Sequence, residues 1–508
     1  MKKIYGCIIF IILIGIIASL IIARPQKVDK LDEIKVLDSY GNEIDNYSEN
    51  KMPFTIKKQN DNQTIKVNGK KYEDGERFYE TGEYKIEVSK GIMKKTSTIK
   101  IQDIDKENDD NIYNIYITTA TLPSFMAMLD ISSKDNFHGF FWTQRTQSID
   151  LEYLKNTKKD IKISQNLGIL NNDEFKEKVV GEIKEYIKDV LNTNKDAYFN
   201  LYFEDYRFYL ELELFGKIGL GDNRYTTYMY SDGTSSYTKE YSIGNSYIHK
   251  EFKIREENGY SDFEKEKANY DKLVTDLRSN KLKTNDMPGS FMVREENDEY
   301  NYDYLLISTL RDNVKYLLQF PQLIDFKDEK VANEMKKANF VQIDLKNQYN
   351  NLNEEQKKQF LASIKLEKSA LDQQYFSDAN KKYLVITGTK PYYKEMDKKD
   401  FENLLNKVNN DYKDEYEILY KPHPSALPDE EATDFLESLG IKILPGTIPM
   451  EAIMFIYPNI KLGGFASSLY MSAEKGQTEF FFANNSNELV KPLNILYDSL
   501  FSNAKFYN

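Results

Sequence analysis

The apolar residues of this chain recur with two different periods. Between residues 32 and 103 they alternate with polar residues at every second position, as in half-buried β-strands. Beyond the charged stretch Asp105–Asp110, short apolar runs alternate with longer segments of helical spacing. The change of period divides the chain into a small β module and a larger α/β region.

The β module contains a strong hairpin signal. Two strand-like runs flank Asn68-Gly69, a dipeptide that favours the two-residue turn of a β-hairpin. Further alternating runs follow over residues 84–88 and 96–101. Short alternating strands with turn signals between them predict an immunoglobulin-like β-sandwich over residues 32–104.

The larger region repeats strand-like and helix-like runs in alternation, and the stretch 327–380 is charged and mostly helical in pattern. The expected strands are 112–117, 137–142, 197–203, 383–386, 417–420 and 441–444, and the expected helices are 122–131, 175–191, 401–408, 430–439 and 451–456. Such alternation implies parallel sheets with helices on both faces and ligands at the carboxyl ends of the strands. We predict an α/β fold, a GT-B-like pair of Rossmann-type domains over residues 112–380 and 381–508, with final helices packing back.

The N-terminus begins Met1-Lys2-Lys3 and continues with an apolar run from Ile4 to Ala23. The run has the length of a bilayer-spanning helix and the flanks of a signal segment. We therefore predict a signal anchor or signal peptide over residues 1–24. The anchor is favoured because the run is long and lacks a clean cleavage site, which implies a single-pass membrane protein, or a secreted one if the segment is cleaved.

Composition excludes several classes of function. The chain has 508 residues, a net charge of −12 and 30% charged residues, which is typical of a soluble globular protein and unsuited to broad nucleic-acid binding. Its one cysteine, Cys7, rules out an intramolecular disulfide and a cysteine metal cluster. The three histidines, His138, His249 and His423, are far apart in sequence, so we expect no metal cofactor.

Two short motifs near the C-terminus carry candidate chemistry. Lys421-Pro422-His423-Pro424-Ser425 follows a strand-like run, and Gly463-Gly464-Phe465-Ala466-Ser467-Ser468 precedes a helix-like segment over residues 469–473. Backbone N–H groups at a helix start, together with serine hydroxyls, favour a bound phosphate. A histidine beside that phosphate can hydrogen-bond it or donate a proton to it. Singly, His-Pro is more often a turn and Gly-Gly more often packing, whereas both in this order indicate a nucleotide-phosphate site.

Five segments in order resemble the bacterial sialyltransferases, most closely glycosyltransferase family 80, whose members have two Rossmann-like domains and use CMP-sialic acid. The matching segments are Tyr116 to Pro123, Tyr230-Ser231-Asp232-Gly233, Thr387-Gly388-Thr389, Lys421-Pro422-His423-Pro424 and Gly463 to Tyr470. The last is similar to the family's Gly-Gly-x-Ala-Ser-Ser-Leu-Tyr motif almost letter for letter. The resemblance covers roughly residues 112–490.

The resemblance implies roles for these residues. Ser467 and Ser468 would bind the CMP phosphate, Glu451 the ribose hydroxyls, and His423 would stabilise or protonate the departing phosphate. The donor-binding residues implied are Gly388, Thr389, Lys421, Pro424, Glu451, Gly464, Ser467 and Ser468. The acceptor hydroxyl would attack the anomeric carbon with inversion, without a metal and with no cofactor besides the CMP-sialic acid donor.

One departure from the family pattern concerns the base that takes the acceptor's proton. The family has an aspartate where this chain has Thr118, and threonine cannot act as a base near neutral pH. Asp232 is then the candidate catalytic base, although Ser-Asp-Gly-Thr is also an ordinary turn sequence. Asp130 or Glu204 is a further alternative. On the acceptor side the family's tryptophan is absent, and Tyr392 or Tyr393 lies nearby in sequence.

These observations favour an inverting, sialyltransferase-like enzyme of the bacterial membrane that transfers sialic acid to a hydroxyl of a cell-surface glycan. Two alternatives stay open. The donor would be another CMP-activated sugar, such as a different nonulosonic acid or Kdo, or the chain would be a degenerate, non-catalytic surface protein that binds nucleotide or glycan. The expected partners are a CMP-sugar, an oligosaccharide acceptor and, through the N-terminal segment, a membrane, but no nucleic acid.

Overall fold

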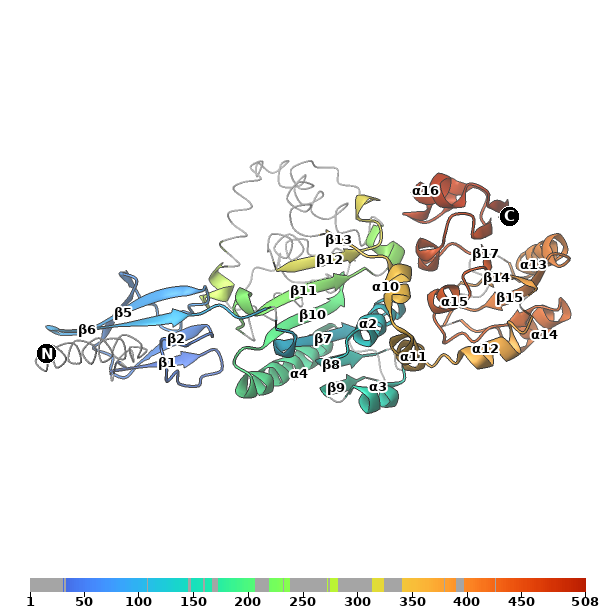
Figure 1. The fold of residues 1–508 in the computed structure, drawn as a ribbon. Coiled ribbons are helices and arrows are strands. Elements are labelled where there is room, and N and C mark those ends of the chain that lie inside the picture. Colours follow the sequence, from blue (N-terminus) through green and yellow to red (C-terminus); the bar gives the residue numbers. More distant parts are fainter. Residues whose placement is uncertain are drawn as a thin grey trace, which may run out of the picture. The chain divides into compact units, whose positions relative to one another are not determined.

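The structure is a computed structural model. It describes residues 31, 33–106, 108–144, 148–158, 160–166, 172–205, 219–231, 233–237, 272, 275–281, 313–323, 340–378, 380–389, 397–424 and 426–508. The described chain forms two compact units. The first contains the residues up to Ile104 together with residues 219–223 and 278–281, and the second contains the rest. Each unit is treated separately below, and both are drawn in Figure 1.

The first unit is built of antiparallel strands: β1 (Ile34–Asp38), β2 (Phe54–Lys58), β3 (Thr64–Val67), β4 (Lys70–Lys71), β5 (Gly82–Lys90) and β6 (Met93–Ile101). β1 pairs with β2, and the other four form a sheet in the order β4-β3-β5-β6. The predicted hairpin is confirmed, since Asn68 and Gly69 both have positive φ, as a tight hairpin turn requires. An immunoglobulin-like topology for this unit stays a prediction.

The second unit contains two parallel sheets, and in each the strand order reverses at one point. Over the described residues the first sheet has the order β13-β12-β11-β10-β7-β8-β9, and every neighbouring pair is parallel. Its strands are β7 (Ile112–Thr118), β8 (His138–Thr143), β9 (Asp160–Gln165), β10 (Tyr198–Glu204), β11 (Tyr225–Tyr230), β12 (Val314–Leu318) and β13 (Phe340–Gln342). The order reverses between β7 and β10, where a parallel sheet usually binds its ligand.

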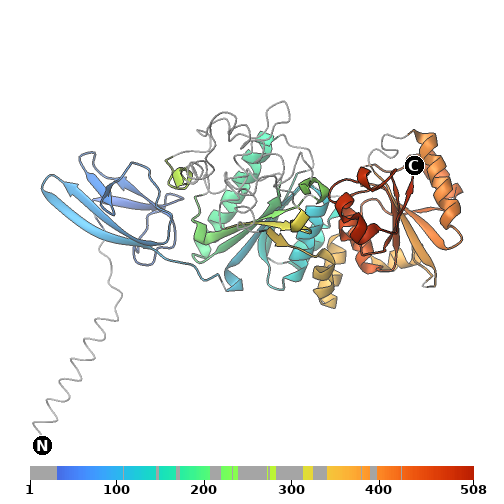
Figure 2. The same cartoon turned by 90° about the horizontal axis from the view of Figure 1, so that it is seen from above.

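Helices cover both faces of this sheet. Those that follow its strands are α2 (Thr121–Ser133), α3 (Leu151–Thr157), α4 (Asn172–Thr193), α10 (Leu345–Asn351), α11 (Glu354–Ser363) and α12 (Lys368–Gln374), with 3-10 turns η1 (Asp109–Asn111), η5 (Asp222–Arg224), η6 (Gly233–Tyr237) and η9 (Pro321–Leu323). Phe140 of β8 packs against Tyr186 of α4. Tyr116 of β7, whose ring lies on the other face, bonds to Asp130 of α2. α4 and α2 therefore lie on opposite sides of the sheet, as Figure 2 also shows.

The second sheet has the order β16-β15-β14-β17-β18-β19, also parallel throughout the described residues. Its strands are β14 (Lys382–Thr387), β15 (Tyr416–Lys421), β16 (Lys442–Ile443), β17 (Lys461–Gly464), β18 (Thr478–Phe482) and β19 (Lys505–Tyr507). The helices and turns that connect them are α13 (Lys398–Tyr412), α14 (Glu430–Ser438), α15 (Met450–Ile456), η10 (Ser468–Ser472), η11 (Ser486–Glu488), α16 (Leu493–Leu496) and η12 (Tyr497–Phe501). The strand order reverses between β14 and β17. The helical segments α16 and η12 precede the edge strand β19, and the expected packing of final helices back onto the domain stays a prediction.

The core of the second sheet explains why its strands read as continuous apolar runs. Leu384 and Ile386 of β14 pack with Phe401 and Leu405 of α13, and all four side chains are fully buried. A parallel strand is covered on both faces, so its sequence need not alternate with polar residues. The α/β class and the GT-B-like arrangement expected from the sequence are thus observed. The domain limits at residues 380 and 381 stay a prediction.

The predicted membrane anchor is corrected here. In the part of the chain that the structure describes, no helix is long and apolar enough to cross a bilayer. The apolar run on which the expectation rested, Ile4 to Ala23, lies outside the described residues. A bacterial-membrane location through a single-pass N-terminal anchor is therefore not supported.

We expect Gly464→Ala to destabilise the second unit. Gly464 ends β17 with φ +121°, and a Cβ there would lie 2.5 Å from the Thr387 carbonyl oxygen and 2.8 Å from its amide nitrogen. Strain of this kind costs about 1–3 kcal/mol. Urea-induced unfolding should show a lower midpoint.

Gly181→Ala is the matched control, because Gly181 lies within α4 with no atom within 4 Å of a new Cβ. Alanine favours a helix over glycine by about 1 kcal/mol, so this variant should be at least as stable as the parent. Equal midpoints for Gly464→Ala and the parent would contradict the argument.

Candidate functional site

Three of the sequence motifs meet where the order of the second sheet reverses. Thr387 ends β14 and pairs in register with both Lys421 of β15 and Gly464 of β17. The Thr387 hydroxyl lies 3.1 Å from the Gly463 carbonyl oxygen and 2.9 Å from the Tyr470 hydroxyl. The Gly388 amide donates to the Lys421 carbonyl oxygen at 2.9 Å. These bonds join the carboxyl ends of three strands, where ligands bind in such sheets.

Close packing explains the glycines of these motifs. A Cβ at Gly388 would lie 2.3 Å from the Tyr420 hydroxyl, and one at Gly463 would lie 2.2 Å from the Phe480 ring. Both positions therefore exclude any larger residue unless a neighbour moves. Gly463 is therefore required for packing, and its part in a phosphate motif stays a prediction.

Lys421 and Glu451 form a buried charged pair beside this edge. The Lys421 ammonium donates to the carbonyl oxygens of Pro422 and Gly446, at 3.1 and 3.0 Å. Burial lowers the pKa of Lys421 to about 8, and the Glu451 carboxylate opposes that shift. Burial raises the pKa of Glu451, whereas its own backbone N–H and Lys421 lower it. Burial thus disfavours the charged form of each residue, and the other residue of the pair favours it.

His423 lies two residues beyond the end of β15, and its side chain is exposed. The Ala426 amide donates to the His423 carbonyl oxygen at 3.0 Å, which turns the chain there. Pro424 is half-buried in this turn, and Thr389, beyond β14, is half-buried as well. The motif therefore forms a turn, as His-Pro alone predicts, and this turn leaves the imidazole accessible to solvent.

The helix-like segment expected over residues 469–473 is a 3-10 helix of the same length, one residue earlier in the chain. Ser468 begins η10, a 3-10 helix of five residues, and Ser467 precedes it in extended conformation with no side-chain cap. One 3-10 turn offers free N–H groups, but its dipole is small compared with that of a long α-helix. The hydroxyls of Ser467 and Ser468 are both half-buried.

The Ser-Asp-Gly motif of the first sheet touches this turn. Gly233 has φ +67°, and a Cβ on it would lie 2.4 Å from Cβ of Ser468. η6, which begins at Gly233, thus packs on η10. The catalytic candidate Asp232 and the acceptor-side candidate Tyr392 both lie outside the described residues.

Thr118 ends β7, and its side chain is completely buried. Its hydroxyl donates to the Thr143 hydroxyl at 3.3 Å in the neighbouring strand. The position that carries the family's aspartate therefore holds a neutral, water-excluded side chain.

The two alternative carboxylates lie in different places. Asp130 accepts from the Tyr116 hydroxyl and the Lys134 ammonium, near the far end of α2. At 1.5 Å per residue, it lies about 14 Å from the start of that helix, away from the ligand edge of the sheet. Glu204, by contrast, ends β10 at the edge itself, beside Thr118. Geometry therefore favours Glu204 over Asp130.

Asp205 and Ser236 were not among the residues singled out from the sequence, and Ser231 was given no role of its own; all three lie at the same edge as Glu204. Asp205 is buried and accepts from the Ser236 hydroxyl, which bonds to the Ser231 hydroxyl at 2.9 Å. The available signal was an acidic pair, Glu204-Asp205, directly after an apolar strand.

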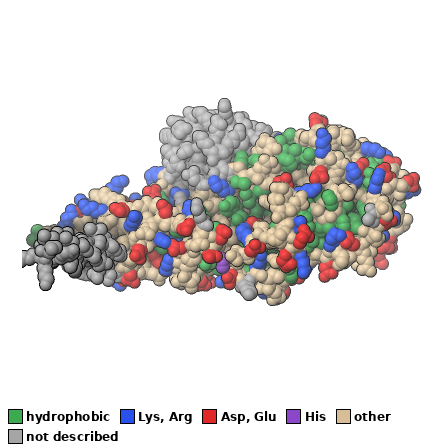
Figure 3. Space-filling model, viewed as in Figure 1, with side chains coloured by type: hydrophobic (Ala, Val, Ile, Leu, Met, Phe, Trp, Pro, Cys, Tyr) green, Lys and Arg blue, Asp and Glu red, His purple; other side chains and the backbone are tan. Residues whose placement is uncertain are grey.

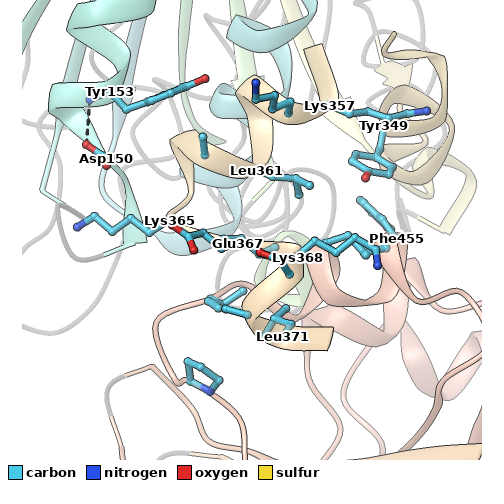
Figure 4. A pocket seen from close by; sticks show the side chains of 18 of the residues that line it. Asp150, Tyr153, Tyr349, Lys357, Leu361, Lys365, Glu367, Lys368, Leu371 and Phe455 are labelled. Atoms are coloured by element: carbon cyan, nitrogen blue, oxygen red, sulfur yellow. Dashed lines mark hydrogen bonds between the residues drawn. The ribbon is translucent and has the colours of Figure 1, made fainter. Parts of the chain in front are cut away.

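A groove of about 1180 Å³ lies elsewhere in the second unit, between α3, α10, α11, α12 and α15. Figure 4 shows some of the side chains that line it, among them the lysines Lys357, Lys365 and Lys368 and the apolar Leu361 and Phe455. None of the motif residues lines it. It is therefore not the site that the motifs form.

Charges of both signs are interspersed over the face of the molecule drawn in Figure 3.

Within the described ranges, no group of three or more histidine, cysteine, aspartate or glutamate side chains is arranged to hold a metal ion. Metal independence itself stays a prediction.

Comparison with known proteins agrees with the motifs. Residues 304–502, less than half of the chain, match the family model described as Sialyltransferase PMO188. Among curated proteins, none matches the chain in a sequence comparison.

Three similar solved structures are bacterial sialyltransferases. An α/β-galactoside α-2,3-sialyltransferase of Photobacterium phosphoreum has a TM-score of 0.53 and 13% identity, over 78% of this chain and 98% of that one. A 2,6-sialyltransferase of a Photobacterium species, in complex with CMP and lactose, has a TM-score of 0.53 and 14% identity, over 95% and 92%. The GT-B domain of the Photobacterium damselae enzyme has a TM-score of 0.51 and 16% identity, over 78% and 100%. At such identities the structures establish the GT-B fold, and the family model confirms the resemblance of residues 304–502 to bacterial sialyltransferases.

Proposed function

We propose that the chain is an inverting sialyltransferase that transfers sialic acid from CMP-sialic acid to a hydroxyl group of a glycan. The observation that carries the proposal is the meeting of Thr387, Lys421 and Gly464 at the reversal point of the second sheet, with Ser468 beside Gly233. Donor-side and acceptor-side motifs converge there. The match of residues 304–502 to the sialyltransferase family model supports the same reaction.

In the proposed mechanism CMP is held by the second sheet. Glu451 accepts hydrogen bonds from the ribose hydroxyls, Lys421 and Gly388 line the cytidine pocket, and Ser467 and Ser468 donate to the phosphate. The acceptor oxygen forms a bond to the anomeric carbon as the bond to the phosphate oxygen breaks, and the electron pair leaves with CMP. The proton of the acceptor hydroxyl passes to the carboxylate of Asp232. His423, exposed on its turn, hydrogen-bonds or protonates that phosphate oxygen. The reaction needs no metal in this scheme.

A second candidate is a degenerate nucleotide- or glycan-binding protein. The buried, neutral Thr118 favours it, because a positioned base contributes about 10²–10⁴-fold to rate. The donor preference is also a proposal, since another CMP-activated sugar would use the same phosphate and ribose contacts.

Calorimetric titration of the full chain with CMP, UMP and GMP tests the donor site. We expect selective CMP binding that falls at least tenfold in a Ser467→Ala/Ser468→Ala variant, because two hydroxyl donors to a charged phosphate are lost. A Ser486→Ala/Ser499→Ala variant, outside the motifs, should bind CMP as the parent does. A folded parent protein that binds no nucleotide would reject both the transferase and the nucleotide-binding reading.

His423→Ala separates binding from chemistry. We expect kcat with CMP-sialic acid and lactose to fall about 10²–10³-fold, because the leaving phosphate loses its acid or hydrogen-bond donor. Affinity for CMP should change little, since the serines and Glu451 remain. His138→Ala is the matched control, because His138 begins β8 and pairs with Asp160 on the amino edge of the first sheet. Equal kcat for the parent and His423→Ala would remove His423 from the mechanism.

Thr118→Asp compared with Thr118→Asn tests whether the site tolerates a second acid. An aspartate at 118 would be buried beside Glu204, and burial and like charge both raise its pKa above the unfolded value of about 3.9. As pH rises from about 3.9 to the raised pKa of the folded state, the folded protein loses stability. The loss is about 2 kcal/mol for a pKa shift of 1–2 units. Thermal melts between pH 4 and 8 should show a growing deficit relative to Thr118→Asn.

The same pair of variants distinguishes the two candidate functions. If the parent is a competent transferase, Thr118→Asp gives no rate gain over Thr118→Asn. A gain of about 10²-fold would mean that the base had been lost and would favour the degenerate binding protein.

A further inference from the structure

The central strand of the first sheet ends in two buried carboxylates. Glu204 is 0% exposed and Asp205 is 4% exposed, and they stand at the carboxyl end of β10. β7 and β11 flank this strand on either side. Two adjacent buried carboxylates are costly unless each receives hydrogen bonds, so their partners indicate what they are for.

Glu204 bonds to the turn between β7 and α2. Its Oε1 atom accepts from the amide and the hydroxyl of Thr119, the latter at 3.1 Å, and from the Ala120 amide at 3.0 Å. Ala120 is the N-cap of α2, has no side-chain cap of its own, and no acidic residue follows in the first turn. Glu204 therefore supplies the cap and the negative charge that this 13-residue helix lacks locally.

Asp205 bonds to the loop on the other side. It accepts from the Ser236 hydroxyl, and the hydroxyls of Ser236 and Ser231 lie 2.9 Å apart. The Ser231 hydroxyl also lies 3.3 Å from the Gly233 carbonyl oxygen. This chain of bonds sets the conformation of the segment at Gly233 that packs on Ser468.

We propose that Glu204 and Asp205 are a positioning pair, which holds from one strand end the two loops that form the acceptor side of the site. The inference rests on the proposed transferase function and assigns the two residues different effects. Glu204 acts on the turn at Thr119 and Ala120. Asp205 acts on the loop that reaches Ser468, so it also couples the acceptor side to the donor phosphate site.

Amide variants test the pair with little change of shape. Glu204→Gln and Asp205→Asn keep size and one acceptor oxygen but lose the charge, and charge-assisted bonds are roughly twice as strong as neutral ones. Asp150→Asn is the matched control. Asp150 caps α3 through the Tyr153 amide at 2.9 Å, so it makes the same kind of bond in the same unit without touching either loop.

Steady-state kinetics of the full chain with CMP-sialic acid and lactose, together with CMP calorimetry, give the first readout. For Glu204→Gln we expect the acceptor KM to rise about tenfold with the CMP Kd unchanged. For Asp205→Asn we expect both the acceptor KM and the CMP Kd to rise severalfold. The control should leave both unchanged. Equal effects of Glu204→Gln and Asp205→Asn on the CMP Kd would overturn the division of roles.

Amide hydrogen exchange gives a second readout that needs no activity. We expect Glu204→Gln to speed exchange at Thr119 and Ala120, and Asp205→Asn to speed it at residues 233–237, each leaving the other loop unaffected. If the parent binds no CMP, the transferase proposal fails while the exchange pattern still judges the pair. Unchanged exchange at both loops, or acceleration throughout the unit, would refute the positioning role.

Discussion

The close approach of strand ends β14 and β17 is the constraint on which the candidate site depends. Gly464 lies so near the Thr387 backbone that no side chain fits between them, and the Thr387 hydroxyl fills the remaining gap with bonds to Gly463 and Tyr470. These strands lie where the sheet order reverses, which is the place where the loops of such a sheet usually diverge and a ligand binds. Motif residues of three strand ends lie at this edge.

This packing also explains the buried charges of the donor edge. Lys421 is 5% exposed, and its ammonium donates to two backbone carbonyl groups and lies in the field of Glu451. A buried pair of this kind contributes little net stability, because desolvation offsets the attraction. Its retention is easier to understand as preparation for a ligand, which would supply hydroxyl and carbonyl partners to groups that have already lost their water.

Much of the fold could be predicted from sequence, but unevenly. Strands β7, β14 and β15 are largely apolar runs, and their positions were predicted to within a residue or two. β14 and β15 also end directly before a glycine and a proline. β9 and β11 were missed because polar residues interrupt them: Asp160–Gln165 is an edge strand, and Tyr225–Tyr230 contains two threonines among its tyrosines. An exposed edge strand, or a strand whose tyrosines pack on one another, lacks the apolar run or the regular alternation by which a strand is recognised in a sequence.

The donor side was similarly more predictable than the acceptor side. Its motifs are contiguous and contain glycines whose steric need is local, so Gly388, Lys421 and Gly464 could be identified from sequence and are found at one edge. The bonds of Glu204 and Asp205 join residues 31 to 85 positions apart. Only the strand order makes such residues neighbours, and no local spacing encodes that order.

The acceptor edge has a further electrostatic consequence. If this edge lies beside bound CMP-sialic acid, as proposed, two bare carboxylates there would repel that anion strongly in a low-dielectric environment. Here one carboxylate faces the N–H groups at the start of α2 and the other faces serine hydroxyls, so much of their charge is balanced by bonds within the sheet edge. The same bonds that fix the two loops thereby reduce the field that the donor would meet. A neutral Thr118 beside Glu204 fits this arrangement, since a third carboxylate at the edge would find no comparable set of donors.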